Sequence, residues 1–425
     1  MTLPSRPNGA IIDAGLLILT LMVSGQLLIQ TGIQSGVWLL CYALALLRIA
    51  MNWTALQAVF LRNGWVFGYG VGSLASALWA VDPLGSLTAA VQLNVTLLIA
   101  FYLGWRYSVV TLVRAIAVLF AFGIAFSLLH WATHVFPWPV HTDAGGLAGL
   151  FSHKNMLGGR ALFLSVFLVA FLLMGEGRTA LNRRPLLMAL LAVALLALAL
   201  SKAMTSLILL SVVMSAFCLL SLSRMPLVLS VTVSGCILVA VAVGPLVLTA
   251  LAIAPVHAVL DLSGKDVPLT GRTVLWSVAL NVIGDNPLLG VGYGAFWTAP
   301  GFANQVLLTQ EAGAVTSTSF HNFALEIMVA SGPLGLVAML GLIGVAITRL
   351  WRLYTCPCNR DRSILAGACL ALILGAVGDA MMGASLYRQH EFYLVFLAAL
   401  AVSAQEDWRQ DMKTTPMLWR ASYAV

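Results

Sequence analysis

The chain has 425 residues, of which 61% are hydrophobic and 9% are charged, whereas a soluble domain carries about 25% charged residues. This balance excludes a soluble enzyme, a nucleic-acid-binding protein and a disordered chain. Lys and Arg outnumber Asp and Glu by 22 to 15, and in so apolar a chain this excess indicates loops on the cytoplasmic side of a membrane. Long apolar runs favour helices over the short alternating strands of a barrel. The sequence therefore predicts an all-α polytopic membrane protein, with residues 1–425 forming a single integral-membrane domain.

The apolar runs are long enough to cross a bilayer many times. A spanning helix needs about 20 mostly apolar residues, and by that measure the sequence predicts about 12 transmembrane helices. They cover 11–30, 36–51, 63–80, 86–104, 112–131, 157–175, 185–201, 205–222, 226–253, 321–348, 363–387 and 390–405. The third span is the weakest, because it is rich in Gly and Ser.

The distribution of charge predicts the orientation. With the N-terminus in the cytoplasm, sixteen of the 22 Lys and Arg residues fall on the inner side, as the positive-inside rule requires. The six outer ones are Lys154, Arg160, Lys202, Lys265, Arg272 and Arg388, and all seven histidines (His130, His134, His141, His153, His257, His321 and His390) also fall at the outer side. For any single residue, a wet outer loop is an equally good explanation. Together they predict an outward-facing cavity for an anionic ligand such as a phosphate.

A large outer loop is predicted over 254–320, between spans 9 and 10. Within it, apolar residues recur on one face of an amphipathic helix near 271–284, with Arg272 in its first turn. We expect this helix to lie along the membrane surface, with Trp276 near the headgroups. The Gly-rich segment 290–294 that follows is either a phosphate-cradling loop or a flexible turn.

Three short motifs carry a resemblance to a known family. His321 and Asn322 are followed by nine residues and then by Gly332-Pro333-Leu334-Gly335. This pattern resembles the H-[NSQ]-x9-G-x-x-G signature of the O-antigen ligase and polysaccharide polymerase superfamily. The segment 271–294 is similar to that family's outer loop, and 151–158 is similar to the H-K-N-x-x-G segment of its exopolysaccharide polymerases. The motifs cover only 151–160, 271–294 and 321–335, whereas the span pattern is similar over most of the chain.

The resemblance implies a GT-C-like fold and a membrane glycosyltransferase of surface polysaccharide biosynthesis. Such enzymes act in the bacterial inner membrane, with cytoplasmic termini and a periplasmic active site. They transfer glycan from an undecaprenyl-diphosphate-linked oligosaccharide to an acceptor glycan or to lipid A-core, invert the anomeric centre and need no metal. The H-K-N segment favours a polymerase of O-antigen or exopolysaccharide repeats, and an O-antigen ligase is the alternative. A 12-span transporter of an anion or small solute is the alternative from another class.

The implied partners are lipid-linked glycan and membrane lipids, with no nucleic acid and no cofactor. The sequence contains no H-E-x-x-H or C-x-x-C pattern and no outer acidic pair spaced to hold a metal, so no metal site is predicted.

A diphosphate leaving group needs fixed cations to stabilise its developing charge. Arg272 is the first candidate, because it begins a helix whose free N–H groups also favour anions; its alternative role is a headgroup anchor. Lys154, Arg160 and Lys202 are the next candidates for binding the diphosphate. Lys202 lies in a short turn, where its side chain either points inward to a phosphate or snorkels outward.

The acceptor is a sugar hydroxyl that loses its proton as it attacks. His321 is the candidate general base, since an imidazole suits this role at neutral pH and a helix N-terminus keeps it uncharged. Its alternative role is that of a cap or interfacial histidine. His153 is a second candidate, and Asn155 and Asn322 are candidates to hydrogen-bond sugar or phosphate.

Glu326 and Asp379 lie within predicted spans, where a carboxylate is costly and often functional. Glu326 follows His321 in the same span, and it either orients His321 or pairs with an Arg. Asp379 lies in a glycine-rich span, which indicates close helix packing and a structural role. Gly332 and Gly335 are expected to let another helix approach closely.

Overall fold

The computed structural model describes residues 9–142, 145–174, 184–221, 270–299, 301, 319–356, 359–383 and 385–414. The predicted ninth span at 226–253, Lys265, His257 and most of the predicted loop at 254–320 lie outside these residues. The side chain of Arg272 also lies outside the described part.

The described residues are almost entirely helical. The helices used below are α1 (Ala10–Ser24), α2 (Gln34–Met51), α3 (Trp53–Asn63), α4 (Gly68–Ser76), α5 (Pro83–Arg106), α6 (Val109–Thr133), α7 (Lys154–Leu173), α8 (Arg184–Ser201), α9 (Met204–Ser221), α12 (Thr270–Asp285), α13 (Ala295–Thr298), α15 (Phe323–Thr355), α16 (Arg360–Ala380) and α17 (Phe392–Thr414). Among the described residues, eight helices are long and apolar enough to cross a membrane. The prediction of an all-α polytopic membrane protein is confirmed, and the total of 12 spans stays a prediction.

One predicted span differs from its expected form. Residues 63–80 form a 3-10 turn, Gly64–Phe67, followed by the nine-residue α4, and α3 occupies the interval before them. The segment is interrupted because Gly is a poor helix former and four glycines fall between 64 and 72.

Helix starts follow capping rules. The side chain of Asp82 accepts a hydrogen bond from Gly85 N at 3.0 Å, with Pro83 at the first position of α5. Asn359 accepts from Arg362 N at 3.0 Å at the start of α16. These side chains satisfy backbone N–H groups that have no partner within the helix.

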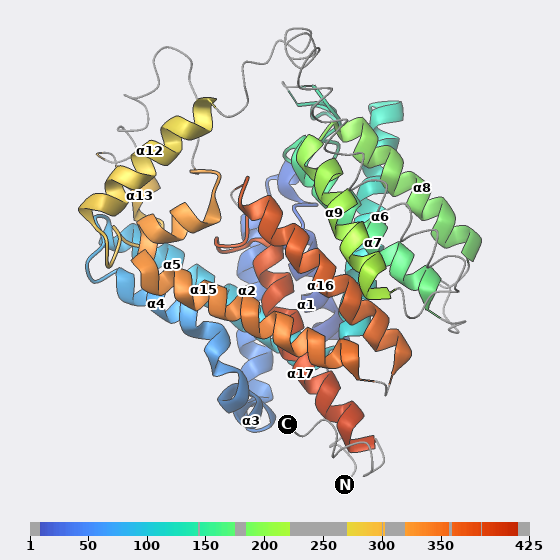
Figure 1. The fold of residues 1–425 in the computed structure, drawn as a ribbon, viewed down its shortest axis with the longest axis horizontal. Coiled ribbons are helices and arrows are strands. Elements are labelled where there is room, and N and C mark those ends of the chain that lie inside the picture. Colours follow the sequence, from blue (N-terminus) through green and yellow to red (C-terminus); the bar gives the residue numbers. More distant parts are fainter. Residues whose placement is uncertain are drawn as a thin grey trace.

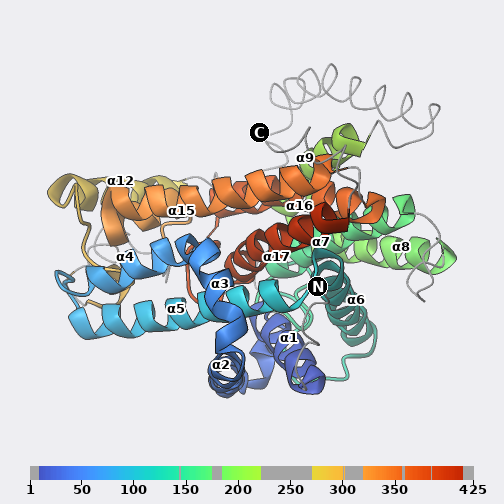
Figure 2. The same ribbon diagram turned by 90° about the horizontal axis from the view of Figure 1, so that it is seen from below.

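The helices form one bundle with two ends. Figures 1 and 2 show α6, α7, α8 and α9 together at one flank, and α12 and α13 at the other, beside the first turns of α15 and α5. We call the end where α1 and α16 finish and where α7, α15 and α17 begin the site end. The opposite end, where α1 begins and α2 and α5 finish, is the far end.

A buried charge cluster lies at the far end. The carboxylate of Asp13 is fully buried and accepts hydrogen bonds from Arg48 Nε at 2.7 Å and Nη2 at 3.1 Å. It also accepts from Tyr102 Oη at 2.6 Å and from Arg106 Nε at 2.6 Å. The cluster ties α1, α2 and α5 together, and each carboxylate oxygen has two donors.

Helix α15 is broken within its length. Gly332 has φ 63° and ψ −166°, a conformation that favours glycine, and the next residue, Pro333, has no N–H. The carbonyls of Val329 and Ala330 lose helical partners at this break. Val291 N and Gly292 N donate to them instead, at 2.8 and 3.0 Å.

This pairing explains Gly332 and the glycine-rich segment 290–294. A Cβ on Gly332 would lie 2.2 Å from Leu288 O, so the close approach is made by the non-helical segment 288–292 and not by another helix. A Cβ on Gly335 would meet Ser331 and Ile327 of α15 itself. The phosphate-cradle interpretation of 290–294 is wrong, because the amides of Val291, Gly292 and Tyr293 are already bonded, the last to Ser76 Oγ at 2.9 Å. The segment repairs a broken helix where unpaired backbone is costly.

The predicted helix near 271–284 corresponds to α12. Its apolar face packs on protein: Leu275, Val278, Ala279 and Val282 form a cluster with Phe296, Phe320 and Val329. The indole N–H of Trp276 donates to Phe320 O at 2.9 Å. Helix α12 is thereby joined to the residue that precedes His321.

Candidate active site

A cavity of about 290 Å³ opens at the site end. We call it the first cavity. It brings together four of the predicted site residues, His153, Asn155, Arg160 and His321. The other lining residues are Gln26, Ser152, Met156, Thr205, Asp379, Met382, Gly383, Ser385, Glu391 and Tyr393. The cavity therefore gathers two histidines, an arginine and two carboxylates from segments far apart in the sequence.

Arg160 is the buried cation of the first cavity. Its side chain is only 2% exposed, and its guanidinium lies over the rings of Phe120, Phe392 and Tyr393, at 5.6, 4.9 and 5.5 Å from their centroids. Its Nε donates to Gly25 O at 3.5 Å, whereas the buried Nη2 has no hydrogen-bond partner in the described part of the chain. A buried donor without an acceptor is costly, and a phosphate oxygen in the cavity would supply one.

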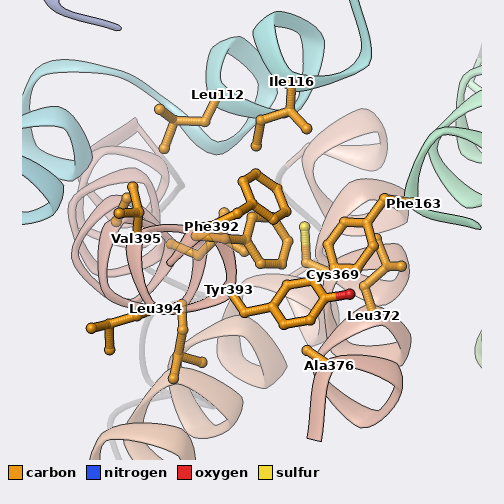
Figure 3. Packing of buried hydrophobic residues seen from close by; sticks show 14 of the residues in the cluster. Leu112, Ile116, Phe163, Cys369, Leu372, Ala376, Phe392, Tyr393, Leu394 and Val395 are labelled. Carbon is orange, nitrogen blue, oxygen red and sulfur yellow. The ribbon is translucent and has the colours of Figure 1, made fainter. Parts of the chain in front are cut away.

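Two of the aromatic rings that contact Arg160, those of Phe392 and Tyr393, come from the start of α17. Figure 3 shows Phe392 and Tyr393 packed with Phe163 and with side chains of α6 and α16. The rings of Phe163 and Tyr393 are stacked with centroids 5.3 Å apart. Cation–π contacts with two or more rings fix the guanidinium without neutralising it.

Two carboxylates, those of Asp379 and Glu391, also line the first cavity. Asp379, in the last turn of α16, accepts a hydrogen bond from Ser385 Oγ at 3.2 Å and also interacts with the hydroxyl of Tyr393. Glu391 directly precedes α17. Both carboxyl groups interact electrostatically with the guanidinium of Arg160. Sequence reasoning missed Glu391 and treated Asp379 as structural. The signal that was available is that the two acids flank one short turn between predicted spans.

His153 caps helix α7 at the mouth of the cavity. Its Nδ1 accepts a hydrogen bond from Asn155 N at 3.2 Å, which places the proton of the neutral ring on Nε2. Partial burial, followed by the charge of Lys154, lowers the pKa of His153 below its usual value. The imidazole is therefore neutral at neutral pH, with its Nδ1 lone pair used in the cap and its Nε2–H available as a donor.

His321 lines the same cavity from the start of α15. Its φ is 53° and its N–H donates to Ser319 Oγ at 2.9 Å. The helix begins two residues later, because Asn322 Oδ1 caps it by accepting from Ala324 N at 3.0 Å and Leu325 N at 3.2 Å. The side-chain oxygen of Asn322 thus has a structural task, and the left-handed turn directs His321 to the cavity.

Two predicted cations, Lys154 and Lys202, stand apart from the first cavity, and a third, Arg272, has a side chain outside the described residues. Lys154 is buried and its Nζ donates to Gly145 O at 3.0 Å, so it fastens the loop before α7. Lys202 is exposed in the turn between α8 and α9. Arg272 falls in the first turn of α12. Lys154 and Lys202 are absent from the lining, and the described residues leave the side chain of Arg272 unplaced.

Glu326 pairs with an arginine rather than with His321. Its Oε1 accepts from Phe320 N at 2.6 Å and lies 4.0 Å from Arg388 Nη2, and its Oε2 accepts from Trp297 Nε1 at 3.2 Å. Of its two predicted roles, the pairing with an Arg is the one found.

Within the described ranges, no group of three or more His, Cys, Asp or Glu is arranged to hold a metal.

The fold and the cavity define a polytopic helical membrane protein with a buried cation and two histidines in one cavity at one end of its bundle. Residues 186–340 match the family model described as O-antigen ligase. The chain is 31% identical over 155 residues to "Exopolysaccharide production protein ExoQ" of Rhizobium meliloti (strain 1021). The aligned region covers 35% of this chain and 35% of that protein. The predicted resemblance to the O-antigen ligase and polymerase superfamily is confirmed.

The family match covers only part of the first cavity. His321 and Thr205 fall inside residues 186–340, whereas Arg160, Asp379 and Glu391 fall outside them. The alignment also spans only about a third of the curated relative. The fold, rather than the matched segment alone, brings the charged groups together.

Proposed function

We propose that the protein is an integral-membrane glycosyltransferase of surface polysaccharide biosynthesis, leaning to a polymerase of O-antigen or exopolysaccharide repeats. The observation that carries the proposal is the buried Arg160, with one nitrogen lacking an acceptor, in the same cavity as His321 and His153. The motif at 321–335 and the match at 186–340 support the substrate class. The donor is an undecaprenyl-diphosphate-linked oligosaccharide, and the acceptor is a glycan or lipid A-core.

In the proposed reaction, an acceptor hydroxyl oxygen attacks the anomeric carbon of the donor sugar. The new C–O bond forms as the bond from that carbon to the diphosphate oxygen breaks, so one displacement inverts the anomeric centre. His321 takes the hydroxyl proton. His153 is the second candidate for that role, and it would first have to release its Nδ1 from Asn155 N. Arg160 stabilises the negative charge that grows on the departing diphosphate, and Arg272 and Lys202 are candidates to assist from neighbouring segments.

The proposed location follows from the positive-inside pattern. The protein lies in the bacterial inner membrane with both termini in the cytoplasm, and the site end faces the periplasm. Neither the reaction nor this orientation requires a resident metal or cofactor, because fixed cations and a neutral imidazole supply the charge stabilisation and the base.

Turnover by the purified protein in nanodiscs tests the proposal. The substrate is undecaprenyl-diphosphate carrying one repeat unit, given with and without lipid A-core, and products are read by gel and mass spectrometry. Longer glycan on the carrier indicates a polymerase, and glycan on lipid A-core indicates the alternative ligase. No product from either mixture contradicts the glycosyltransferase proposal. Unchanged yield on addition of a chelator is the expected result for metal-independent chemistry.

A further inference from the structure

A second cavity, of about 210 Å³, lies beside the first. Four aromatic residues contribute to its lining, namely Tyr293, Phe296, Trp297 and Tyr387. Three residues with planar polar groups, Glu326, Arg388 and Gln389, also line it. The second cavity has no role in the mechanism above.

The two cavities share a wall made of two chain segments. In the segment 319–326, His321 lines the first cavity and Glu326 lines the second. In the segment 385–391, Ser385 and Glu391 line the first cavity, whereas the residues between them, Tyr387, Arg388 and Gln389, line the second. A ligand that fills the second cavity therefore lies one chain thickness from the groups proposed to act in the first.

The polar groups of the second cavity are held in place before any ligand binds. Glu326 accepts from Trp297 Nε1 at 3.2 Å, and the indole also contacts the rings of Phe296 and Phe320, each with centroids 4.8 Å away. Tyr293 Oη donates to Gln389 Oε1 at 2.9 Å and accepts from Gln389 N at 3.1 Å. Preorganised side chains lower the entropy lost on binding.

We propose that the second cavity binds one pyranose ring of the acceptor glycan. A sugar ring presents an apolar C–H face and a rim of hydroxyls, and it meets here an aromatic wall with a few fixed polar groups, the composition typical of small-molecule sites. Pockets for drug-sized ligands measure about 300–1,000 Å³, so a cavity of about 210 Å³ suits a single ring. This inference rests on the proposed function and adds a specificity-determining subsite to it.

The shared wall is the reason for assigning the sugar ring in the second cavity to the acceptor and not to the donor. Arg160 places the donor diphosphate in the first cavity, and His321 stands between the two cavities. A ring in the second cavity presents a hydroxyl at the wall, where His321 removes its proton. The transfer itself is the displacement already written, with no further reactant.

Binding of two unreactive probes to the nanodisc-embedded protein tests this assignment. The first probe is the lipid-free repeat-unit oligosaccharide, measured by saturation-transfer NMR, and the second is undecaprenyl diphosphate without sugar. Trp297→Ala is expected to weaken oligosaccharide binding about tenfold, on the scale of aromatic contacts with an apolar face. Its binding of undecaprenyl diphosphate stays within about twofold of wild type. Trp131→Ala, at an exposed tryptophan that lines neither cavity, is the matched control.

Two further variants keep the test decisive if Trp297→Ala folds poorly. Trp297→Phe retains a ring face and keeps most of the affinity, and Gln389→Ala removes polar contacts from the other wall and weakens the oligosaccharide without changing the fold of α13. Wild-type affinity for the oligosaccharide in both Trp297→Ala and Gln389→Ala overturns the subsite. Equal loss of both probes also overturns it, because Trp297 would then support the first cavity.

A third probe separates the acceptor from the donor as the source of the ring. It is the carrier-linked repeat unit with its terminal hydroxyl capped, which can act only as a donor. A tenfold loss of its affinity in Trp297→Ala, beyond any loss for undecaprenyl diphosphate, assigns the cavity to the donor and overturns the proposal. Turnover of the wild-type protein is measured separately, so failure of the proposed function and failure of the subsite give different results.

Discussion

Two clusters of buried charge lie at opposite ends of α1, and they differ in how completely their groups are paired. At the far end, the carboxylate of Asp13 has four donors from Arg48, Tyr102 and Arg106. At the site end, Arg160 packs against aromatic rings, and its Nη2 has no acceptor within the described residues. A complete cluster has nothing left to bind, so it joins helices. An incomplete one beside a cavity retains capacity for a ligand, which is why we place the chemistry there.

The largest effect is expected from the general base at the site end. His321→Ala should lower turnover by about 10²–10⁴-fold, with the melting temperature of the nanodisc-embedded protein kept at the wild-type value. His134→Ala is the matched control, because His134 also has a positive φ, of 51°, and lines neither cavity. Wild-type turnover in His321→Ala would remove the base from the proposed reaction.

The next largest effect is expected at the far end, on stability. Asp13→Ala leaves the buried guanidinium of Arg48 and the part-buried one of Arg106 without their carboxylate, and breaking a buried ion pair in this way costs about 3 to 5 kcal/mol. The expected result is a lower melting temperature and a lower membrane yield, with wild-type turnover per folded molecule. A stable protein that loses turnover would mean that the far end takes part in the chemistry.

A pair of matched arginine variants sharpens the contrast. Undecaprenyl diphosphate should raise the melting temperature of the wild-type protein, because a ligand that binds only the folded state stabilises it. Arg160→Met should abolish this rise. Arg106→Met should lower the melting temperature yet keep the rise. The same ligand-induced shift in both variants would show that Arg160 does not contact the diphosphate.

The smallest effect is a pH dependence at the mouth of the cavity. The folded-state pKa of His153 is lowered, first by burial and then by Lys154, so the unfolded state binds more protons below pH about 6.5. The stabilisation from His153 is present above that pH and is lost as the pH falls below it. Melting temperatures from pH 7.5 to 5 should fall less steeply in His153→Asn, which keeps a capping oxygen. An identical slope in the two proteins would contradict the lowered pKa.

Arg160 and His321 were predictable from the sequence because the positive-inside pattern and the span boundaries placed them at the outer side. Lys154 shows the limit of that reasoning. It adjoins His153, yet its ammonium turns to Gly145 O, since the direction of a side chain depends on the loop packed against it. Glu391 was missed for a related reason: its cationic neighbour Arg160 lies far away in sequence, on α7.

The sequence predicted that α12 is a helix, but it did not predict that the apolar face of α12 packs against protein. Amphipathic periodicity reports that one face is apolar, and lipid and protein satisfy such a face equally. The pairing of segment 288–292 with α15 could not be predicted either, although the sequence did indicate one of the two partners. Pro333 frees the carbonyl four residues earlier, Val329, and only the fold shows that Val291 fills the gap.

The repaired break in α15 also has a consequence for biosynthesis. Val291 and Gly292 precede Val329 and Ala330 in the chain, so the ribosome makes the two N–H donors before the two carbonyls that need them. When α15 leaves the translocon, the segment that pairs with its unpaired backbone has already been synthesised. The order of synthesis therefore spares the broken helix a period of exposure to hydrocarbon, where each unpaired carbonyl would cost several kcal/mol.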